Sequence, residues 1–301
     1  MAPKWGVRLA RVLRNIGALK SGDLYMPSPI LLGSRLLLAA VTIGTLSVTT
    51  AHAAKTTECT ALQLCFCVNQ DFKPLIAEKV KFFRSVIAEQ RAKGKAIGYV
   101  SVPLSTLGGG FFDVNAEVSL AAKKRVEARF GEANVWALNP ASTDSELKVG
   151  STFGTNDDYM HMWTQIIESP SGMGEDFDFV YFVGPTDFGA LFGLDGKGDM
   201  DKINGYFDTR LETDAGLKRE VARGRVTKNS FRNYYALKAS VSFSNGAHDE
   251  WNIFRLLNER RRADAKYGVA NQIGVLFDGK PVSPVESEQT IAAGVSGACK
   301  I

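Results

Sequence analysis

Apolar side chains recur along the chain in two alternating patterns, one typical of strands and one typical of helices. Short, nearly continuous apolar runs predict strands at residues 96–104, 134–138, 177–183, 236–243 and 272–277. Apolar residues three or four apart predict a helix at residues 71–91, before the first of these runs. The segments between the runs predict further helices at residues 113–130, 156–168, 202–211, 215–223 and 249–262. The alternation predicts a single α/β domain at residues 71–281, with a doubly wound, mostly parallel sheet of about five strands and helices on both faces.

The first 53 residues have the pattern of a secretory signal peptide. Arg35 precedes an apolar run at residues 36–46, and Ala51-His-Ala53 then provides a small-residue cleavage site. The run is shorter than the roughly 20 apolar residues that span a bilayer. We therefore expect cleavage after Ala53, a periplasmic or secreted protein, and no stable membrane anchor after cleavage. Met26 is an alternative start that would give a signal of ordinary length.

The net charge of the chain comes from this leader. The whole sequence has 36 basic and 32 acidic residues, and the first 53 residues contain six basic residues and one acidic residue. The remainder therefore has 30 basic and 31 acidic residues. Because nucleic-acid binding requires a basic face that displaces counterions, we expect no nucleic-acid partner.

Four cysteines lie near the two ends of the exported part, in a segment at residues 54–70 and a tail at residues 282–301. They are Cys59, Cys65, Cys67 and Cys299. An even number of cysteines in an exported chain suggests disulfides, and Cys299 could tie the tail back to the first segment. A metal site is the alternative, but the paired two-residue spacings of zinc ribbons are missing. The sequence leaves the pairing open.

Two loops at predicted strand ends are candidates for binding a small molecule. Gly108, Gly109 and Gly110 follow the first strand and precede a helix with Asp113 in its first turn. Bare backbone at a helix N-terminus suits phosphate or another anion, although a packing turn is the alternative. Gly184 and Asp187 follow the most apolar strand, where Asp187 could hold a sugar hydroxyl, act as an acid or base, or cap the next turn.

Metal and cofactor sites have little support in the sequence. The acidic loop at residues 195–201 does not match the calcium-binding EF-hand pattern, because Lys197 takes a ligand position. His161 and His248 are the two histidines outside the leader, and their spacing does not fit a zinc site. We expect His161 to be packed in the core, and we expect no metal and no cofactor.

The stretch at residues 239–259 predicts a strand, a tight turn at Asn245-Gly246 and a helix. His248, Asp249 and Glu250 follow the turn, with Glu250 expected in the first helical turn, where the helix dipole favours an anion. An ionised glutamate in a cleft can attack a sugar carbon or stabilise an oxocarbenium ion. Asp249 and His248 could adjust its pKa. The alternative is that these residues only begin the helix.

This stretch resembles a family that acts on nucleosides. Residues 244–250, Ser-Asn-Gly-Ala-His-Asp-Glu, resemble the Asp-Ser-Gly-Thr-x-x-Glu turn of nucleoside 2-deoxyribosyltransferases, with the same interval from Gly246 to Glu250. Residues 180–185, Val-Tyr-Phe-Val-Gly-Pro, resemble an early strand of that family. A similar interval and a triple-glycine turn occur in phosphoribohydrolases that release cytokinins. The resemblance implies that Glu250 is a nucleophile in the cleavage of an N-glycosidic bond.

The sequence therefore supports two main hypotheses. The first is an exported enzyme that cleaves or transfers an N-glycosidic bond in a nucleoside-like small molecule. In this hypothesis Glu250 reacts, Asp187, Asp249 and His248 assist, and Gly108–Gly110, Asp113, Gly184 and Gly246 contact the substrate. The second is a non-catalytic periplasmic protein that binds a small molecule or a partner at the same strand ends; a structural envelope protein is a third reading. Because ligands bind at the carboxyl ends of strands in open α/β sheets, these residues are expected at one edge of the sheet.

Overall fold

A five-stranded sheet forms the centre of the part of the chain that the structure describes, which comprises residues 54–104, 107–291, 294 and 297–300. In this computed structural model the first four strands pair in parallel and β9 pairs antiparallel to β8. The spatial order is β4 (Val135–Leu138), β3 (Ala96–Ser101), β7 (Phe179–Phe182), β8 (Gly274–Phe277) and β9 (Lys280–Pro281). The predicted α/β class and mostly parallel sheet are confirmed. The predicted signal peptide and its cleavage site lie outside the described residues.

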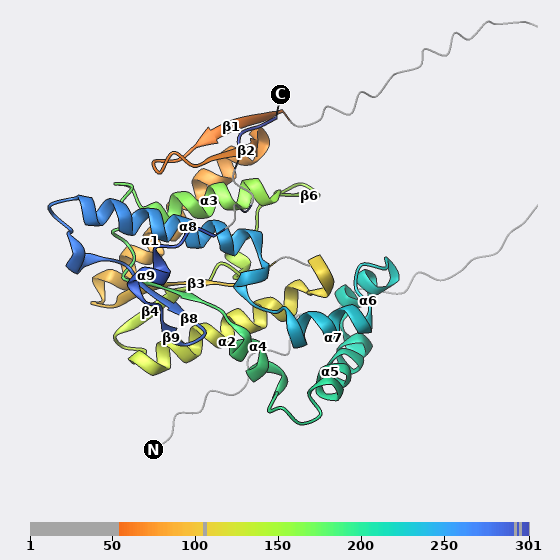
Figure 1. Cartoon of the computed structure of the whole chain (residues 1–301). Helices are drawn as coiled ribbons and strands as arrows, with labels where there is room; N and C mark the ends of the chain where they lie inside the picture. Colours follow the sequence, from red (N-terminus) through yellow and green to blue (C-terminus); the bar gives the residue numbers. More distant parts are fainter. Residues whose placement is uncertain (1–53, 105–106, 292–293, 295–296, 301) are drawn as a thin grey trace, which may run out of the picture. The chain divides into compact units, whose positions relative to one another are not determined.

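The central strands are apolar because both of their faces are covered. Ile97, Tyr99 and Val100 in β3 are fully buried, as is Val180 in β7. α3 (Asn156–Glu168) packs against α1 (Lys73–Ala92) and α8 (Asn245–Ala263), whereas α2 (Phe112–Phe130) packs against α4 (Pro185–Phe192). In Figure 1, the first group lies above the sheet and the second group lies below it. The sheet is thus the middle layer between two groups of helices.

Three further helices form a separate helical insertion between β7 and β8. They are α5 (Asp199–Thr213), α6 (Ala215–Ala222) and α7 (Lys228–Leu237), and they lie together at one side of the molecule in Figure 1. Aromatic side chains join them, since Phe231 of α7 contacts Phe207 of α5 and Tyr235 of its own helix at ring-centroid distances of 5.1 and 4.5 Å. The insertion therefore has its own aromatic core.

The strand predicted at residues 236–243 is wrong. α7 continues to Leu237, because Phe231, Tyr234 and Tyr235 have helical spacing and are all buried. The chain then makes a 3₁₀ turn at Val241–Phe243, in which the Ser240 side chain accepts a hydrogen bond from the Ser242 backbone. The fifth strand is instead β9. It follows the predicted turn at Asp278-Gly279, where both residues have positive φ, as a two-residue hairpin turn requires.

Two disulfides hold the ends of the described chain. β1 (Lys55–Cys59) and β2 (Cys65–Asn69) form an antiparallel hairpin closed by the Cys59–Cys65 bond. Cys67 bonds to Cys299, so the C-terminal tail is tied to β2 as the sequence suggested. The tail contains the short helix α9 (Pro284–Ser287), which lies between β9 and Cys299 in the sequence. Both disulfides fit an oxidising compartment outside the cytoplasm.

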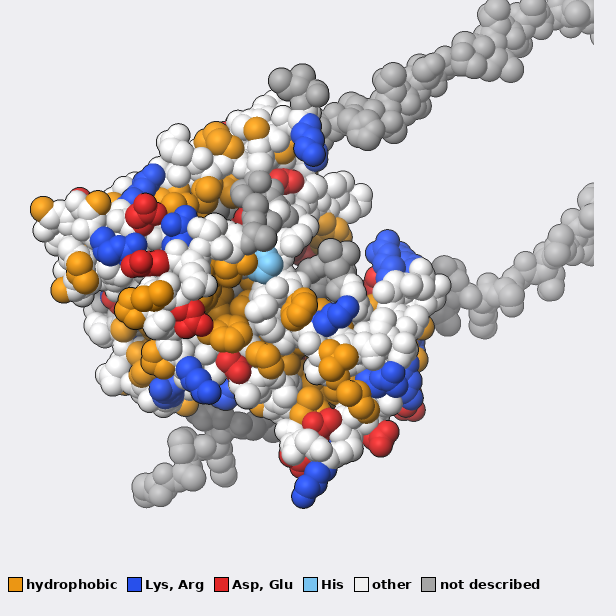
Figure 2. Space-filling view, in the orientation of Figure 1, with side chains coloured by type: hydrophobic (Ala, Val, Ile, Leu, Met, Phe, Trp, Pro, Cys, Tyr) orange, Lys and Arg blue, Asp and Glu red, His pale blue; other side chains and the backbone are white. Residues whose placement is uncertain are grey.

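The surface in Figure 2 mixes positive and negative side chains without a large region of one sign. Apolar side chains appear between them in separate patches on this face. Within the described ranges, no helix has both the length and the apolar character needed to cross a membrane.

Candidate functional site

A cavity of about 640 Å³ opens at the carboxyl ends of β3 and β4. One wall of the cavity is formed by Val102 and Leu104, which follow β3, and by side chains within residues 140–146, which follow β4. The opposite wall comes from the N-terminal parts of α3 and α8, and Glu250 of α8 lines the cavity. The candidate carboxylate thus lies at the edge of the sheet where a ligand was expected.

Two hydroxyl groups of β3 hold Glu250 in place. The Tyr99 hydroxyl donates to Oε1 and the Ser101 hydroxyl donates to Oε2, so each carboxylate oxygen has one donor. Glu250 is 6% exposed. Tyr99 and Ser101 are two residues apart in a strand, so their side chains point to the same face of the sheet. The hydrogen bonds fix the carboxylate and leave further lone pairs on both oxygens for a ligand.

Burial raises the pKa of Glu250 to about 7, and the negative charge of Asp249 adds to this effect. The hydrogen bonds from Ser101 and Tyr99 act in the opposite direction and limit the rise. The expected stabilisation by the helix dipole is wrong, because α8 begins at Asn245 and Glu250 falls in the second turn. Glu250 therefore exchanges a proton near neutral pH, as suits an acid or base.

Aromatic rings form much of the cavity wall. Trp163 of α3 is 4% exposed and lies among the buried core residues, together with the partly buried Tyr159. Phe112, Phe153 and Phe243 are 45%, 54% and 60% exposed and also line the cavity, so they form its outer part. A ring-shaped ligand would therefore meet aromatic surface along the depth of the cavity.

Glu146 is a second carboxylate that lines the same cavity. It lies in residues 141–155, which connect β4 to α3. The segment contains a 3₁₀ turn and a short hairpin of β5 (Lys148–Val149) and β6 (Thr152–Phe153). No sequence motif marks Glu146, because its position depends on how this loop returns toward α3.

His248 and Asp249 lie beside Glu250 in sequence but face other groups. His248 Nε2 is 3.0 Å from the Ser242 carbonyl oxygen, and Asp249 accepts a hydrogen bond from the Gly294 backbone at 3.1 Å. His248 lines a second cavity of about 480 Å³ between α8, the β8–β9 hairpin and the tail. Gly246 lines the Glu250 cavity as expected. Asp249 influences Glu250 through its charge, whereas His248 is separated from the cavity.

Asp187 is a buried cap residue rather than a neighbour of Glu250. Its carboxylate accepts hydrogen bonds from the Gly184 backbone and the Tyr181 hydroxyl, both at 3.0 Å, and forms an ion pair with Arg125. Gly184 is the N-cap of α4, and a Cβ there would lie 2.3 Å from Cβ of Asp278. Neither Gly184 nor Asp187 is among the described residues that line the Glu250 cavity.

The triple-glycine turn packs against the helical insertion. A Cβ at Gly109 would lie 2.2 Å from the Ser230 carbonyl oxygen, and Gly109 has a φ of +108°, so this position requires glycine. Gly108, Gly109 and Gly110 do not line the Glu250 cavity, although Phe112, two residues later, does. Ser105 and Thr106 lie outside the described residues. The contacts of this loop fit the alternative interpretation, in which the three glycines form a packing turn.

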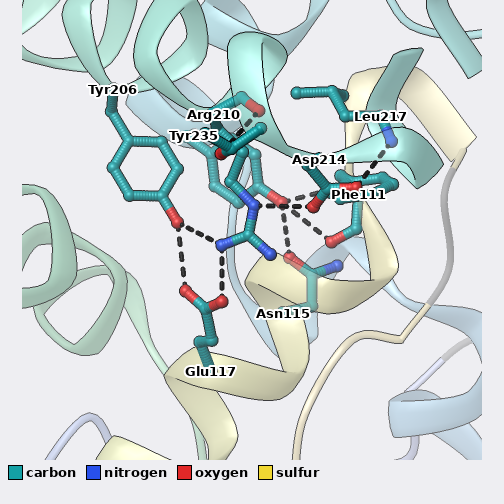
Figure 3. A network of polar contacts seen from close by, with 9 residues as sticks. Phe111, Asn115, Glu117, Tyr206, Arg210, Asp214, Leu217 and Tyr235 are labelled. Carbon is teal, nitrogen blue, oxygen red and sulfur yellow. Dashed lines mark hydrogen bonds and ion pairs between the residues drawn. The ribbon is translucent and has the colours of Figure 1, made fainter. Parts of the chain in front are cut away.

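A polar network joins the insertion to the start of α2 (Figure 3). The Tyr235 hydroxyl accepts a hydrogen bond from the Phe111 backbone at 3.0 Å, and Arg210 bridges Glu117 and Asp214. Burial raises the pKa of Asp113, and the nearby Asp214 adds to the rise. Asp113 thus lies near the charges of this network and does not line the cavity. The network fixes the first turn of α2, from which Phe112 reaches the cavity.

The polar partners of Glu250 carry a weak signal in the sequence. Tyr99 and Ser101 are alternate residues near the end of a strand that is otherwise apolar. Polar side chains at this spacing share one face, so they mark a site only once a partner is known to cover that face. No group of His, Cys, Asp and Glu within the described ranges could hold a metal ion. No protein-family model, curated protein or solved structure shows significant similarity to the chain.

Proposed function

We propose that the protein is an exported enzyme that cleaves or transfers the N-glycosidic bond of a nucleoside-like small molecule. The observation that carries this proposal is the buried carboxylate of Glu250, which faces an aromatic-lined cavity and has hydroxyl partners but no cation among the described residues. Such a group is reactive, because no ion pair neutralises it. Glu250 acts on the sugar, either as a nucleophile or as a charge that stabilises an oxocarbenium ion.

The residues around Glu250 have different roles in this proposal. Tyr99 and Ser101 orient the carboxylate toward the anomeric carbon. Glu146 is the second carboxylate of the cavity and is a candidate for protonating the leaving group or activating water. Trp163 and Tyr159 offer aromatic surface to a base. Asp187 is assigned no direct role in this scheme.

The topology of the sheet supports a ligand site at this position. The chain runs from β3 outward to β4 and then crosses back to β7 on the other side of β3. The strand order therefore reverses beside β3, and such a reversal opens a crevice at the carboxyl ends of the strands. We infer from this order that the domain is doubly wound, with Glu250 bonded to β3, the strand beside the crevice.

Export through a cleavable signal peptide at residues 1–53 is part of the proposal. The disulfides Cys59–Cys65 and Cys67–Cys299 support it, because such bonds persist in oxidising compartments. The enzyme would then act on molecules that reach the periplasm or the medium.

The engagement of Asp187 favours a second candidate function, a non-catalytic periplasmic binding protein. The carboxylate expected to assist Glu250 is used by Arg125, Tyr181 and the start of α4. A cavity with one buried carboxylate and aromatic walls is also what a small-molecule binder needs.

A comparison of Glu250→Gln with Glu132→Gln tests the enzyme proposal. Both changes remove one negative charge, but Glu132 is exposed and lies outside both cavities. The disulfide-bonded protein is incubated with a panel of nucleosides, and release of the free base is measured. We expect Glu250→Gln to lower kcat by about 10³-fold or more, while Glu132→Gln stays near wild type. Binding of nucleosides without base release by the wild type would favour the binding protein instead.

A further inference from the structure

The charged side chains that line the Glu250 cavity are of one sign. Among the described residues that line it, the acidic groups are Glu146 and Glu250, and none is Lys, Arg or His. The remaining polar lining groups are hydroxyls and amides, which carry no formal charge. The cavity is therefore neutral to negative, and a negatively charged ligand would find no opposite charge on its walls.

The aromatic walls favour a positive charge as well. Phe112, Phe153 and Phe243 surround the outer part of the cavity, with Tyr159 and Trp163 further along its wall. The faces of aromatic rings attract cations, and clusters of such rings bind quaternary nitrogen. Lys148 already places its ammonium 5.0 Å from the centre of the Phe153 ring. Aromatic rings and carboxylates together suit a flat cation.

The helix N-termini at the cavity do not reverse this preference. Thr155 accepts a hydrogen bond from the Asp158 backbone at the start of α3, and Ser244 accepts one from the Ala247 backbone at the start of α8. Asp157 and Asp158 add negative charge to the first turn of α3. A phosphate group needs free backbone donors at such a position, and these caps already use a donor at each helix.

We propose that the cavity selects a cationic aromatic small molecule, and that the substrate is an N-glycoside whose leaving heterocycle carries a positive charge, such as an N-ribosylpyridinium. This inference rests on the proposed function and specifies its substrate class. It assigns the two carboxylates a joint role, in which Glu250 lies at the reacting bond and Glu146 attracts the cation.

The chemistry of such a substrate matches a site with one buried carboxylate. The bond between the anomeric carbon and the ring nitrogen breaks, and both electrons go to nitrogen, so the heterocycle leaves as a neutral molecule. No acid is needed to protonate it. Glu250 forms an ester bond with the anomeric carbon, and water then hydrolyses the ester. The products are the free sugar, the neutral heterocycle, the regenerated carboxylate and one proton.

Cation binding should depend on pH because Glu250 gains its negative charge near neutral pH. The titratable groups around it are Tyr99 from β3, which donates a hydrogen bond to its carboxylate, Asp249 from α8, which acts on it through charge alone, and Glu146, which lines the same cavity. The raised pKa of Glu250, at about 7, means that its negative charge develops between mildly acidic and mildly basic pH. We therefore expect cation affinity to rise from pH 6 to pH 8.

Three compounds with the same ring but different charges test the preference. They are 1-methylnicotinamide (cationic), nicotinamide (neutral) and nicotinate (anionic), titrated into the full disulfide-bonded protein by calorimetry. At pH 8 we expect the cation to bind about tenfold more tightly than nicotinamide, and nicotinate to bind most weakly. Equal or tighter binding of nicotinamide or nicotinate would overturn the proposal, as would no binding of the cation at millimolar concentration.

Matched variants locate the effect in the cavity. Glu146→Gln should reduce the preference for the cation to about threefold, and Glu250→Gln should also remove its pH dependence. Glu132→Gln, which makes the same charge change on the exposed surface, should leave the preference unchanged. Because Glu146 is exposed, its variant remains informative even if Glu250→Gln does not fold. An unchanged preference in Glu146→Gln would contradict its role.

Turnover separates this inference from the proposed function. Release of nicotinamide from nicotinamide riboside is compared with release of the base from neutral nucleosides such as inosine. Cleavage of neutral nucleosides without a preference for the cation would overturn the inference and leave the enzyme function intact. A preference for the cation without any cleavage would uphold the selectivity and overturn the enzyme function.

Discussion

Glu250 and Asp187 are two buried carboxylates at neighbouring strands of one sheet, and their surroundings are opposite. Asp187 is 4% exposed and has a cation, Arg125, together with a hydroxyl and a backbone donor. Glu250 is 6% exposed and has two hydroxyl donors but no cation partner among the described residues. The first arrangement satisfies the charge and closes the site. The second leaves a charge uncompensated beside a cavity, which is typical of functional groups.

The largest expected effect is on stability when each charge is removed. The raised pKa of Glu250 means that the folded protein holds this proton more tightly than the unfolded chain does. The protonated carboxyl of Glu250 contributes about 3 kcal/mol to the free energy of unfolding below about pH 4.5, and this contribution is lost as the pH rises through 7. At pH 8 we expect Glu250→Gln to raise the free energy of unfolding by about 1–3 kcal/mol, measured by urea denaturation.

Asp187→Asn is the matched change for that experiment. It removes the negative charge that pairs with Arg125 and replaces one acceptor oxygen with an amide group, so we expect it to lower the free energy of unfolding by about 1–2 kcal/mol. Opposite signs for the two variants would support the contrast. A loss of stability at pH 8 in both would show that Glu250 is compensated as Asp187 is.

A smaller effect is expected when the cation beside Asp187 is removed. Arg125→Gln leaves the buried carboxylate with Tyr181 and Gly184, so the free energy of unfolding should fall by about 1 kcal/mol. The effect is modest because the Arg125 side chain is 44% exposed, and solvent already screens the pair. Lys124→Gln, at the adjacent exposed position of α2, is the control and should change stability little. If the two variants behave alike, the ion pair contributes nothing specific.

The smallest expected effect is a shift in a pH midpoint. The Tyr99 hydroxyl favours the ionised form of Glu250, so Tyr99→Phe should raise the pKa of this carboxylate further. We expect the midpoint of the pH dependence of stability to move upward by up to about one pH unit. Tyr181→Phe removes the corresponding hydroxyl from Asp187 and should leave that midpoint in place. A shift in both variants would show that the effect is not local to Glu250.

The sheet could be predicted from the sequence because its strands are short apolar runs buried on both faces. Residues 96–101, 135–138, 179–182 and 274–277 are strands as expected. The run at 236–243 has similar composition, but Tyr234 and Tyr235 extend the preceding helix into it. Local apolarity does not distinguish a strand from a helix at this position, since the outcome depends on which side chains pack into the aromatic core of the insertion.

The candidate site could be predicted only in part. Glu250 is marked by its distance from Gly246, although the predicted turn at Asn245-Gly246 is wrong. Both residues belong to the first turn of α8, and Glu250 reaches the cavity from the second turn. Its partners Tyr99 and Ser101 are about 150 residues away in sequence, and Arg125 is 62 residues from Asp187. Sequence patterns describe neighbours along a helix or strand. Whether a carboxylate is neutralised depends on contacts that only the folded chain makes.

The bond between Cys67 and Cys299 has a consequence for the topology of the molecule. The two residues are 232 positions apart, so the bond turns the chain between them into a covalent ring that contains the whole sheet and every residue of the Glu250 cavity. A protease that cuts once in the exposed loop at residues 195–198 would open this ring without releasing a fragment. The two halves of the sheet would stay linked and at high local concentration, so a single cut need not separate Glu250 from Tyr99 and Ser101.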